Sequence, residues 1–196
     1  RVWSLLVTVF GDLAQSDGAQ ISGALLRQLT EKIGIKPEAM RVAIHRLRKE
    51  GWIDSRRSGR TSSYHLTDWG RAQSAKASPR IYAATPAATD AWLILLNPSK
   101  PATNVDATGT WLSSNTLITS NKPLSDAAFI TALDAQTIIP EWMSTKVCSA
   151  STLQTCADFA VALGAVKPRL LTNPPMSPVE IAVLRVLLVH SWRRII

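Results

Sequence analysis

Apolar residues along the first 50 positions recur at the spacing of three successive amphipathic helices. The first helix is predicted over the apolar-rich residues 2–14, and the second follows Ser22, which suits an N-cap. In the second helix one face carries the apolar side chains Leu25, Leu26, Leu29 and Ile33. A third helix is predicted from about 37 to 50, with Pro37 in its first turn. The short link between the last two helices has the length of a helix-turn-helix turn.

After the third helix the pattern changes to short runs of residues that favour strands. These runs are residues 53–57 and 61–66, and Gly59 between them suits a tight turn. A β-hairpin is therefore predicted directly after the third helix, which is the element order of a winged helix. Thr67 is expected to cap a fourth helix that ends near Pro79.

The middle of the chain mixes strand and helix patterns. Residues 83–90 form a linker of small residues and proline, and residues 91–97 predict a buried strand. The further expectations are short strands within 111–119, a helix capped by Ser125 over 126–135, a strand within 138–148 and a helix over 151–164. This alternation predicts a small α+β unit.

The last part of the chain is predicted to be helical. Residues 168–178 form a Pro-rich connection, and Ser177 and Glu180 have the spacing of a capping box. The helix that follows is expected to reach about His190 and is apolar on most sides, so we expect it to be buried or at a subunit contact. No apolar run reaches the roughly 18 residues needed to span a bilayer, and no membrane partner is expected.

Charge separates the N-terminal part from the rest. The chain is 46% apolar, which suits a packed core, and its net charge is +8. Residues 1–82 hold 14 Lys and Arg against 7 Asp and Glu, whereas residues 83–196 hold 8 against 7. A basic segment joined to a near-neutral remainder favours a nucleic-acid-binding module linked to a second part.

The positive charge is densest within residues 41–60, which hold seven Lys and Arg and only two acidic residues. A helix in the major groove needs polar side chains on its outer face and cations around it, and a basic hairpin can reach phosphates or the minor groove. The candidate DNA-binding residues are Glu38, Arg41, Val42, His45, Arg46, Lys49, Arg56, Arg57, Arg60 and Ser62. The alternative is a solvated helix face and a surface turn, but solubility alone does not explain so many cations close together.

Other chemistry is sparse. Cys148 and Cys156 are too far apart for a CxxC pair, and two reduced thiols are typical of a cytoplasmic protein. The three histidines are scattered, and no fingerprint of a zinc protease, hydrolase, P-loop or dinucleotide site occurs. We therefore expect no enzyme activity, no metal and no cofactor.

Several segments resemble the PaaX-type repressors of phenylacetic acid degradation. They are SLLVTVFGD (4–12), MRVAIHRLRKEGWI (40–53), SRRSGRTSSYHLTDWGR (55–71), RIY (80–82) and HSWRRII (190–196). The segments occur in the family's order across nearly the whole chain. The resemblance implies a bacterial repressor that binds palindromic operator DNA as a homodimer. It also implies release from DNA by an aryl-CoA thioester, typically phenylacetyl-CoA.

The resemblance also implies a domain order within an α+β fold. We expect a winged helix-turn-helix domain at 1–82, a linker at 83–90, a ferredoxin-like (Cas2-like) domain at 91–167 and a C-terminal helical region at 168–196. Residues 98–107 are too short and irregular for the expected crossover helix, so the middle domain is expected to be incomplete. The chain ends soon after WRRI, where family members continue, so the last region is expected to be truncated.

An aryl-CoA effector would need cations for its phosphates and an aromatic side chain for its ring. The candidates are Trp111, Lys167, Arg169, Trp192, Arg193 and Arg194. An alternative for Arg193 and Arg194 is that they complement the dipole at a helix C-terminus.

The sequence thus predicts a ligand-responsive transcriptional repressor. One alternative keeps this architecture with a different small-molecule effector. Another is a Cas2-like metal-dependent nuclease, which would need a carboxylate at the end of the first strand of the middle domain, where Asn97 stands. A third is an assembly module that uses the winged helix for protein contacts.

Overall fold

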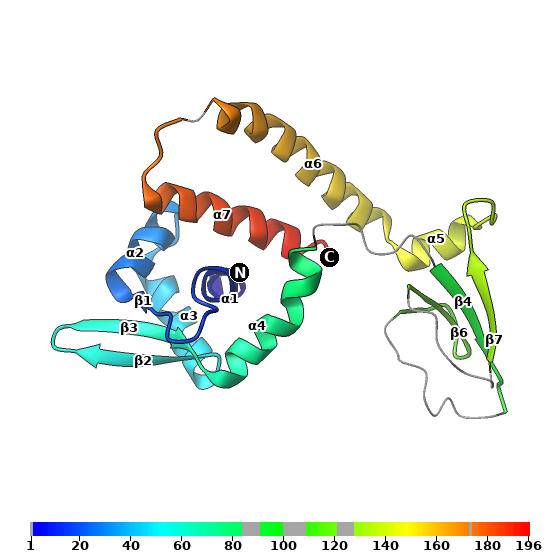
Figure 1. Cartoon of the computed structure of the whole chain (residues 1–196), viewed down its shortest axis with the longest axis horizontal. Helices are drawn as coiled ribbons and strands as arrows, with labels where there is room; N and C mark the ends of the chain where they lie inside the picture. The colour runs from blue at the N-terminus through cyan, green and yellow to red at the C-terminus, as the bar shows by residue number, and fades with distance from the viewer. Residues whose placement is uncertain (1, 84–90, 100–108, 121–127, 173) are drawn as a thin grey trace. The chain divides into compact units, whose positions relative to one another are not determined.

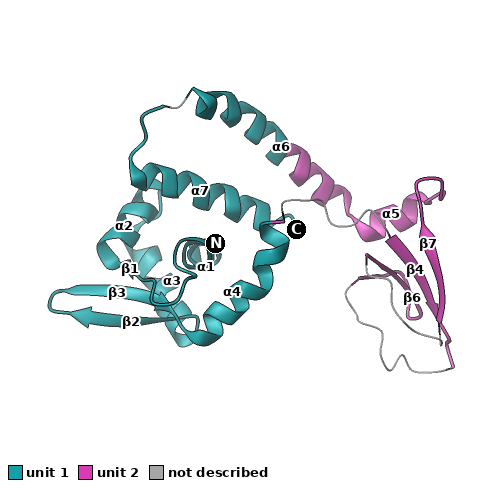
Figure 2. Ribbon diagram, viewed as in Figure 1, with its two compact units in different colours: residues 1–82, 159–196 teal, residues 83–158 magenta. Residues whose placement is uncertain are grey.

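The computed structural model of the chain describes residues 2–83, 91–99, 109–120, 128–172 and 174–196. Over these residues the chain is a mixed α+β protein with two antiparallel sheets (Figure 1). It divides into two compact units, which Figure 2 shows in different colours. The first unit joins residues 1–82 to residues 159–196, and the second unit consists of residues 83–158.

Helices make up most of the first unit. They are α1 (Val2–Leu13), α2 (Gly23–Lys32), α3 (Pro37–Lys49), α4 (Asp68–Ile81), the later part of α6 (Ala150–Leu171) and α7 (Pro178–Arg193). Its sheet has the order β1-β3-β2, formed by β1 (Ile21–Ser22), β2 (Ile53–Ser58) and β3 (Thr61–Leu66). The predicted hairpin after the third helix is confirmed, because β2 and β3 pair antiparallel along their whole length. Gly59 at the turn has a φ of 59°, which favours glycine.

Helix α1 lies at the centre of the first unit's core, where it contacts α3, α4, α7 and β3 (Figure 1). Its side chains Leu6, Val9 and Phe10 are completely buried, and α7 adds Val186, which is also completely buried. The same cluster includes Leu26, Leu29, Leu47, Ile53 and Leu66. The core of this unit is therefore built from both ends of the described chain.

The predicted helix caps of the first unit are confirmed. The side-chain oxygens of Ser22, Thr67 and Ser177 accept hydrogen bonds from the backbone nitrogens of Leu25, Gly70 and Glu180. Ser177 and Glu180 complete the capping box, and Glu180 also pairs with Lys32 on α2 at 3.1 Å. Hydrogen bonds from the backbone and side chain of Ser177, followed by the Lys32 ammonium, lower the pKa of Glu180 to about 2. The cap of α7 therefore also contacts α2.

One prediction about prolines is wrong. Helix α6 runs through Pro168 to Leu171, where a connection is predicted, whereas α4 ends at Ile81, near Pro79 as predicted. Both prolines stand in the last turn of a helix, so the lost N–H and the crowding of the preceding turn's carbonyl affect only the end of the helix. In α4, the Ser78 hydroxyl donates to the carbonyl of Ser74 at 3.0 Å beside this turn.

The second unit contains a four-stranded antiparallel sheet of order β5-β6-β4-β7. The strands are β4 (Ala91–Leu96), β5 (Thr110–Trp111), β6 (Thr116–Thr119) and β7 (Ala128–Leu133). The predicted strand is confirmed as β4, but of its residues only Ile94 is completely buried, and Leu95 is 39% exposed. Leu117 on β6 is also completely buried. Helix α5 (Glu141–Val147) and the start of α6 follow the sheet.

Two element types in the second unit are predicted wrongly. Residues 128–133, which fall within a predicted helix, form β7, because pairing with β4 from Ala91 to Leu96 outweighs their weak helical pattern. Residues 141–147, which fall within a predicted strand, form α5, with Pro140 at its N-cap and Glu141 in its first turn. The predicted cap Ser125, most of the linker 83–90 and most of 98–107 lie outside the described residues.

No helix in the part of the chain that the structure describes is long and apolar enough to cross a membrane. Helix α7, predicted to be apolar on most sides, is buried along one face only. Its residue Val186 is completely buried, whereas Ile181 is 54% exposed.

The contribution of α7 to the core can be measured with one matched pair of substitutions. We expect Val186→Ala to lower the free energy of unfolding by about 2 kcal/mol, since it leaves a cavity among α1 and α7 side chains. Ile181→Ala on the exposed face of the same helix should cost less than half as much. Urea unfolding followed by tryptophan fluorescence measures both. Equal losses in the two variants would contradict the packing of α7 against α1.

Candidate nucleic-acid interface

Helix α3 has two chemically opposite faces. Its buried stripe consists of Met40, Ala43, Ile44 and Leu47, which pack into the core of the first unit. On the opposite side Glu38, Val42, His45 and Lys49 are exposed. Val42 is 69% exposed, and single exposed apolar side chains of this kind are normal on a protein surface. An apolar group among polar ones on a convex helix suits the mixed polar and methyl edges of a DNA major groove.

Arg41 is held beside Glu38 in the first turns of α3. The Arg41 Nη2 atom lies 2.9 Å from Glu38 Oε1, and both side chains are more than two-thirds exposed. Such an exposed pair adds little stability, but it orients the guanidinium along the outer surface of the helix. Because the guanidinium carries five donors, it keeps free donors for a further acceptor.

The hairpin β2–β3 carries a second group of cations. Arg56, Arg57 and Arg60 are exposed at or near its tip, and Arg57 stands opposite Ser62 in the strand register. The hairpin is fixed at its base, since β3 also pairs with β1 and the Ser63 hydroxyl donates to Gln20 Oε1 at 2.7 Å. The cations therefore lie on a hairpin that projects from the helices (Figure 1).

All ten predicted DNA-binding residues belong to the first unit. Nine are exposed and Ser62 is partly buried. Arg46 differs from the other cations in its contacts. Its Nε donates to Glu50 Oε1 at 2.6 Å, and its guanidinium carbon lies 5.1 Å from the centre of the Trp3 ring.

The predicted effector-binding residues are distributed over both units. Trp111 lies on β5 of the second unit, whereas Lys167, Arg169, Trp192, Arg193 and Arg194 belong to the first. Trp192 stacks on Phe159, with ring centres 6.5 Å apart, and its indole nitrogen donates to the carbonyl of Ile81 at 3.0 Å. Lys167 and Arg169 are exposed on α6. Trp192 therefore joins α6 and α7 to the end of α4.

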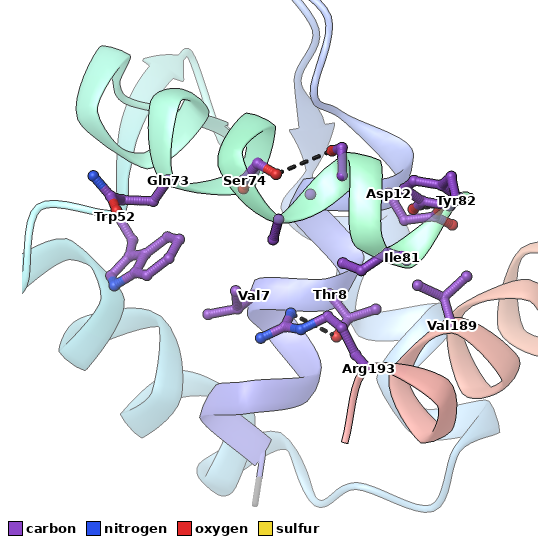
Figure 3. A pocket seen from close by; sticks show the side chains of 13 residues that line it. Val7, Thr8, Asp12, Trp52, Gln73, Ser74, Ile81, Tyr82, Val189 and Arg193 are labelled. Atoms are coloured by element: carbon purple, nitrogen blue, oxygen red, sulfur yellow. Dashed lines mark hydrogen bonds between the residues drawn. The ribbon is translucent and has the colours of Figure 1, made fainter. Parts of the chain in front are cut away.

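Arg193 borders a small cavity between α1, α4 and α7, shown in Figure 3. The cavity measures about 60 Å³, far less than the several hundred ångströms cubed of typical sites for cofactor-sized ligands. Arg193 donates to the Thr8 hydroxyl at 3.1 Å, and burial lowers the pKa of its guanidinium. His190 also contacts Thr8 at 3.1 Å, and burial followed by the charge of Arg193 lowers the pKa of its imidazole. A whole CoA thioester does not fit this cavity.

A polar junction joins α1, α4 and α7 beside this cavity. Asp12, whose side chain is only 1% exposed, accepts two hydrogen bonds from Arg185 at 2.7 and 2.9 Å and one from the Tyr82 hydroxyl at 2.5 Å. Burial, and then the hydrogen bond to Asp12, raise the pKa of Tyr82 to about 12. Sequence analysis missed this junction. No local signal marks it, since Arg185 is 55% exposed and an exposed charge on a helix needs no buried partner.

Among the described residues, no group of three or more His, Cys, Asp or Glu side chains lies close enough to hold a metal ion. The candidate functional groups of the first unit are therefore the exposed cationic and polar side chains of α3 and the β2–β3 hairpin.

The polar junction gives a prediction about stability. Asp12→Asn weakens the bidentate contact to Arg185, and we expect the free energy of unfolding to fall by about 2 kcal/mol, allowing for the half-exposed arginine. Tyr82→Phe removes only one hydrogen bond and should cost about 1 kcal/mol. Urea denaturation measures both losses. No loss in the Asp12 variant would show that the junction does not hold α7 in place.

Comparisons with known proteins point to one family. A family model described as PaaX-like protein matches residues 1–70. The transcriptional repressor PaaX of Escherichia coli (strain K12) is 39% identical over 95 residues, which is 48% of this chain and 30% of that protein. The chain therefore spans about a third of that relative's length.

Among solved structures, an uncharacterized protein from Mycobacterium tuberculosis, Rv0674, is 18% identical with a TM-score of 0.47, over 96% of this chain and 81% of the other. The resemblance to the PaaX-type family is confirmed by the first two matches, and the family model covers the N-terminal residues 1–70.

Proposed function

We propose that this chain is a transcriptional repressor of a phenylacetate-type catabolic operon that binds operator DNA through α3 and the β2–β3 hairpin. The observation that carries the proposal is the outer face of α3, which presents polar and cationic groups opposite a completely apolar buried stripe. This face lies within the residues that match the PaaX-like family. A repressor of this kind acts by occupying DNA, so no enzyme activity, metal or cofactor is part of the proposal.

The proposal includes a finer description of the fold. In the first unit, α1 to α3 followed by the β2–β3 hairpin and α4 correspond to a winged helix-turn-helix. In the second unit, β4 stands between β6 and β7 with β5 at the edge, all antiparallel. That strand order supports the proposed ferredoxin-like, Cas2-like assignment. The proposed division is 1–82, 83–90, 91–167 and 168–196. Its boundary at 167 falls within α6, and the first compact unit already includes residues from 159 onward.

The two cationic elements suit different parts of one duplex. Glu38, Arg41, Val42 and His45 lie in the N-terminal half of α3, which meets base edges in helix-turn-helix proteins. The proposal assigns contacts with phosphates or the minor groove to Lys49 at the C-terminal end of α3 and to four hairpin residues, Arg56, Arg57, Arg60 and Ser62. The proposal therefore assigns sequence reading to α3 and most of the salt-dependent affinity to its surroundings.

The proposed effector is an aryl-CoA thioester such as phenylacetyl-CoA, acting on a cytoplasmic homodimer. This part of the proposal is supported by the family resemblance. A different small molecule is the alternative effector. The nuclease alternative gains no support, since β4 is followed by Asn97, whose side chain accepts a hydrogen bond from the backbone of Ser99 at 2.9 Å.

Base reading by α3 can be separated from general attraction to DNA. We expect Arg41→Ala and His45→Ala each to weaken binding to the operator about tenfold or more, because each removes a proposed base contact. Binding to a random duplex should change less than threefold. Fluorescence anisotropy at constant salt, with a duplex from the protein's own promoter, measures both. Equal losses on operator and random DNA would exclude a role in sequence reading.

The effector prediction concerns release from DNA. Phenylacetyl-CoA is expected to dissociate the complex with the promoter duplex, whereas free CoA and free phenylacetate at the same concentration are not. A gel-shift panel of aryl- and alkyl-CoA thioesters makes the comparison. If no thioester released the DNA, an aryl-CoA effector would be excluded. The proposal that the protein binds DNA would not be affected.

A further inference from the structure

The cations of α3 differ in what they already contact. Arg46 and Glu50 lie on the same flank of the helix, with Arg46 Nε and Glu50 Oε1 at 2.6 Å. The Arg46 guanidinium also lies over the Trp3 ring of α1, 5.1 Å from its centre. On the opposite flank Arg48 is exposed, and the structure shows it in no ion pair with any described residue. Arg46 therefore faces a neighbouring helix, and Arg48 does not.

The ring under Arg46 is the first of three tryptophans in contact. Trp3 meets Trp52 edge to face, with ring centres 6.0 Å apart and planes at 88°. Trp52 in turn meets Trp69 at 5.0 Å and 76°. The three rings belong to α1, to the link between α3 and β2, and to α4. Edge-to-face geometry is attractive between aromatic rings and fixes their mutual orientation. We call these rings the tryptophan row.

Trp52 is also held by its backbone at the point where α3 passes into the hairpin. Its N–H donates to the carbonyl of Leu47 at 2.9 Å, and its own carbonyl accepts from the N–H of Thr67 at 3.1 Å. Gly70 packs so closely that a Cβ atom there would lie 2.2 Å from the Trp52 carbonyl oxygen. Since β2 begins at the next residue, Ile53, the position of Trp52 sets the direction in which the hairpin leaves α3.

We propose that Arg46 is a positioning residue rather than a phosphate contact. Together with Glu50 it clamps the tryptophan row and so fixes the angle between α3 and the β2–β3 hairpin. This inference rests on the proposed function, because the angle matters only if both elements meet one duplex. Arginine suits this role and lysine does not. The flat guanidinium stacks on a ring while its Nε–H holds a carboxylate, whereas an ammonium is a point charge.

The two roles of Arg46 predict opposite results for a charge-conserving change. If Arg46 holds a phosphate, Arg46→Lys keeps the charge and operator binding stays within about twofold of the original protein. If Arg46 is a positioning residue, Arg46→Lys weakens operator binding about tenfold and leaves random-duplex binding unchanged. Arg48→Lys, on the same helix without an ion pair, is the matched control and should bind both duplexes like the original protein.

A substitution of Glu50 gives a second test, because the two roles of Arg46 predict opposite changes in operator affinity. Removing a negative charge close to DNA strengthens binding when only electrostatics act. We expect Glu50→Gln instead to weaken operator binding about fivefold, since Arg46 loses the carboxylate that orients it. Thermal unfolding confirms that each variant is folded, and anisotropy over a salt series gives the affinities.

The outcomes separate this inference from the proposed function. Weaker operator binding by Arg46→Lys and Glu50→Gln, with Arg48→Lys unaffected, supports the positioning role. Original affinity in Arg46→Lys, or tighter binding by Glu50→Gln, overturns it and leaves the repressor proposal intact. If the original protein does not prefer its promoter duplex to a random one, the proposed function and this inference both fail.

Discussion

Burial of α1 is the constraint on which the rest of the first unit depends. Its side chains Leu6, Val9 and Phe10 are completely buried, which requires apolar partners on more than one side. Helices α3 and α4 supply some of these partners, and α7 supplies the others from the far end of the described chain. Because the inner face of α3 is committed to α1, its outer face is left to solvent or to DNA. The proposed recognition surface is therefore a consequence of how the core closes.

The same packing places charged groups where they hold elements together. Asp12 is nearly inaccessible on α1, and Arg185 and Tyr82 satisfy it from α7 and α4. Lys32 and Glu180 join α2 to the start of α7. At the other end of the unit, Arg46 and the tryptophan row join α1, α3 and α4. Electrostatics thus act in two ways here, within the unit as clamps and on its surface as attraction for phosphates.

Local patterns predicted the first unit well, because its elements are determined by signals within a few residues. The cap at Ser22 and the glycine at the hairpin turn each act on their own neighbours. The second unit was harder, since the strand at Ala128–Leu133 owes its conformation to pairing with β4, which is distant in sequence. Pro168 misled for a different reason. It stands in the last turn of α6, where its missing N–H and its ring affect only the end of the helix.

In the candidate site too, local features could be predicted and long-range contacts could not. Periodicity identified the outer face of α3 because one helix carries both the buried stripe and its opposite side. The sequence, however, placed Arg46 among the DNA-binding candidates, although its guanidinium lies over the Trp3 ring of α1. The contact between Asp12 and Arg185 joins residues far apart in sequence, so no local pattern could reveal it. Contacts with residues distant in sequence, rather than residue type, therefore distinguish the cations that hold elements together from those that are exposed without such contacts.

The central claim, that the outer face of α3 lies against operator DNA, can be tested by site-specific photo-crosslinking. A photoreactive benzoylphenylalanine is placed at Val42, which is 69% exposed on α3, or at Val161, which is 74% exposed on α6. With the promoter duplex and ultraviolet light, position 42 should form a covalent protein–DNA product that excess unlabelled operator removes, and position 161 should form none. Crosslinking from 161 but not from 42 would contradict the account.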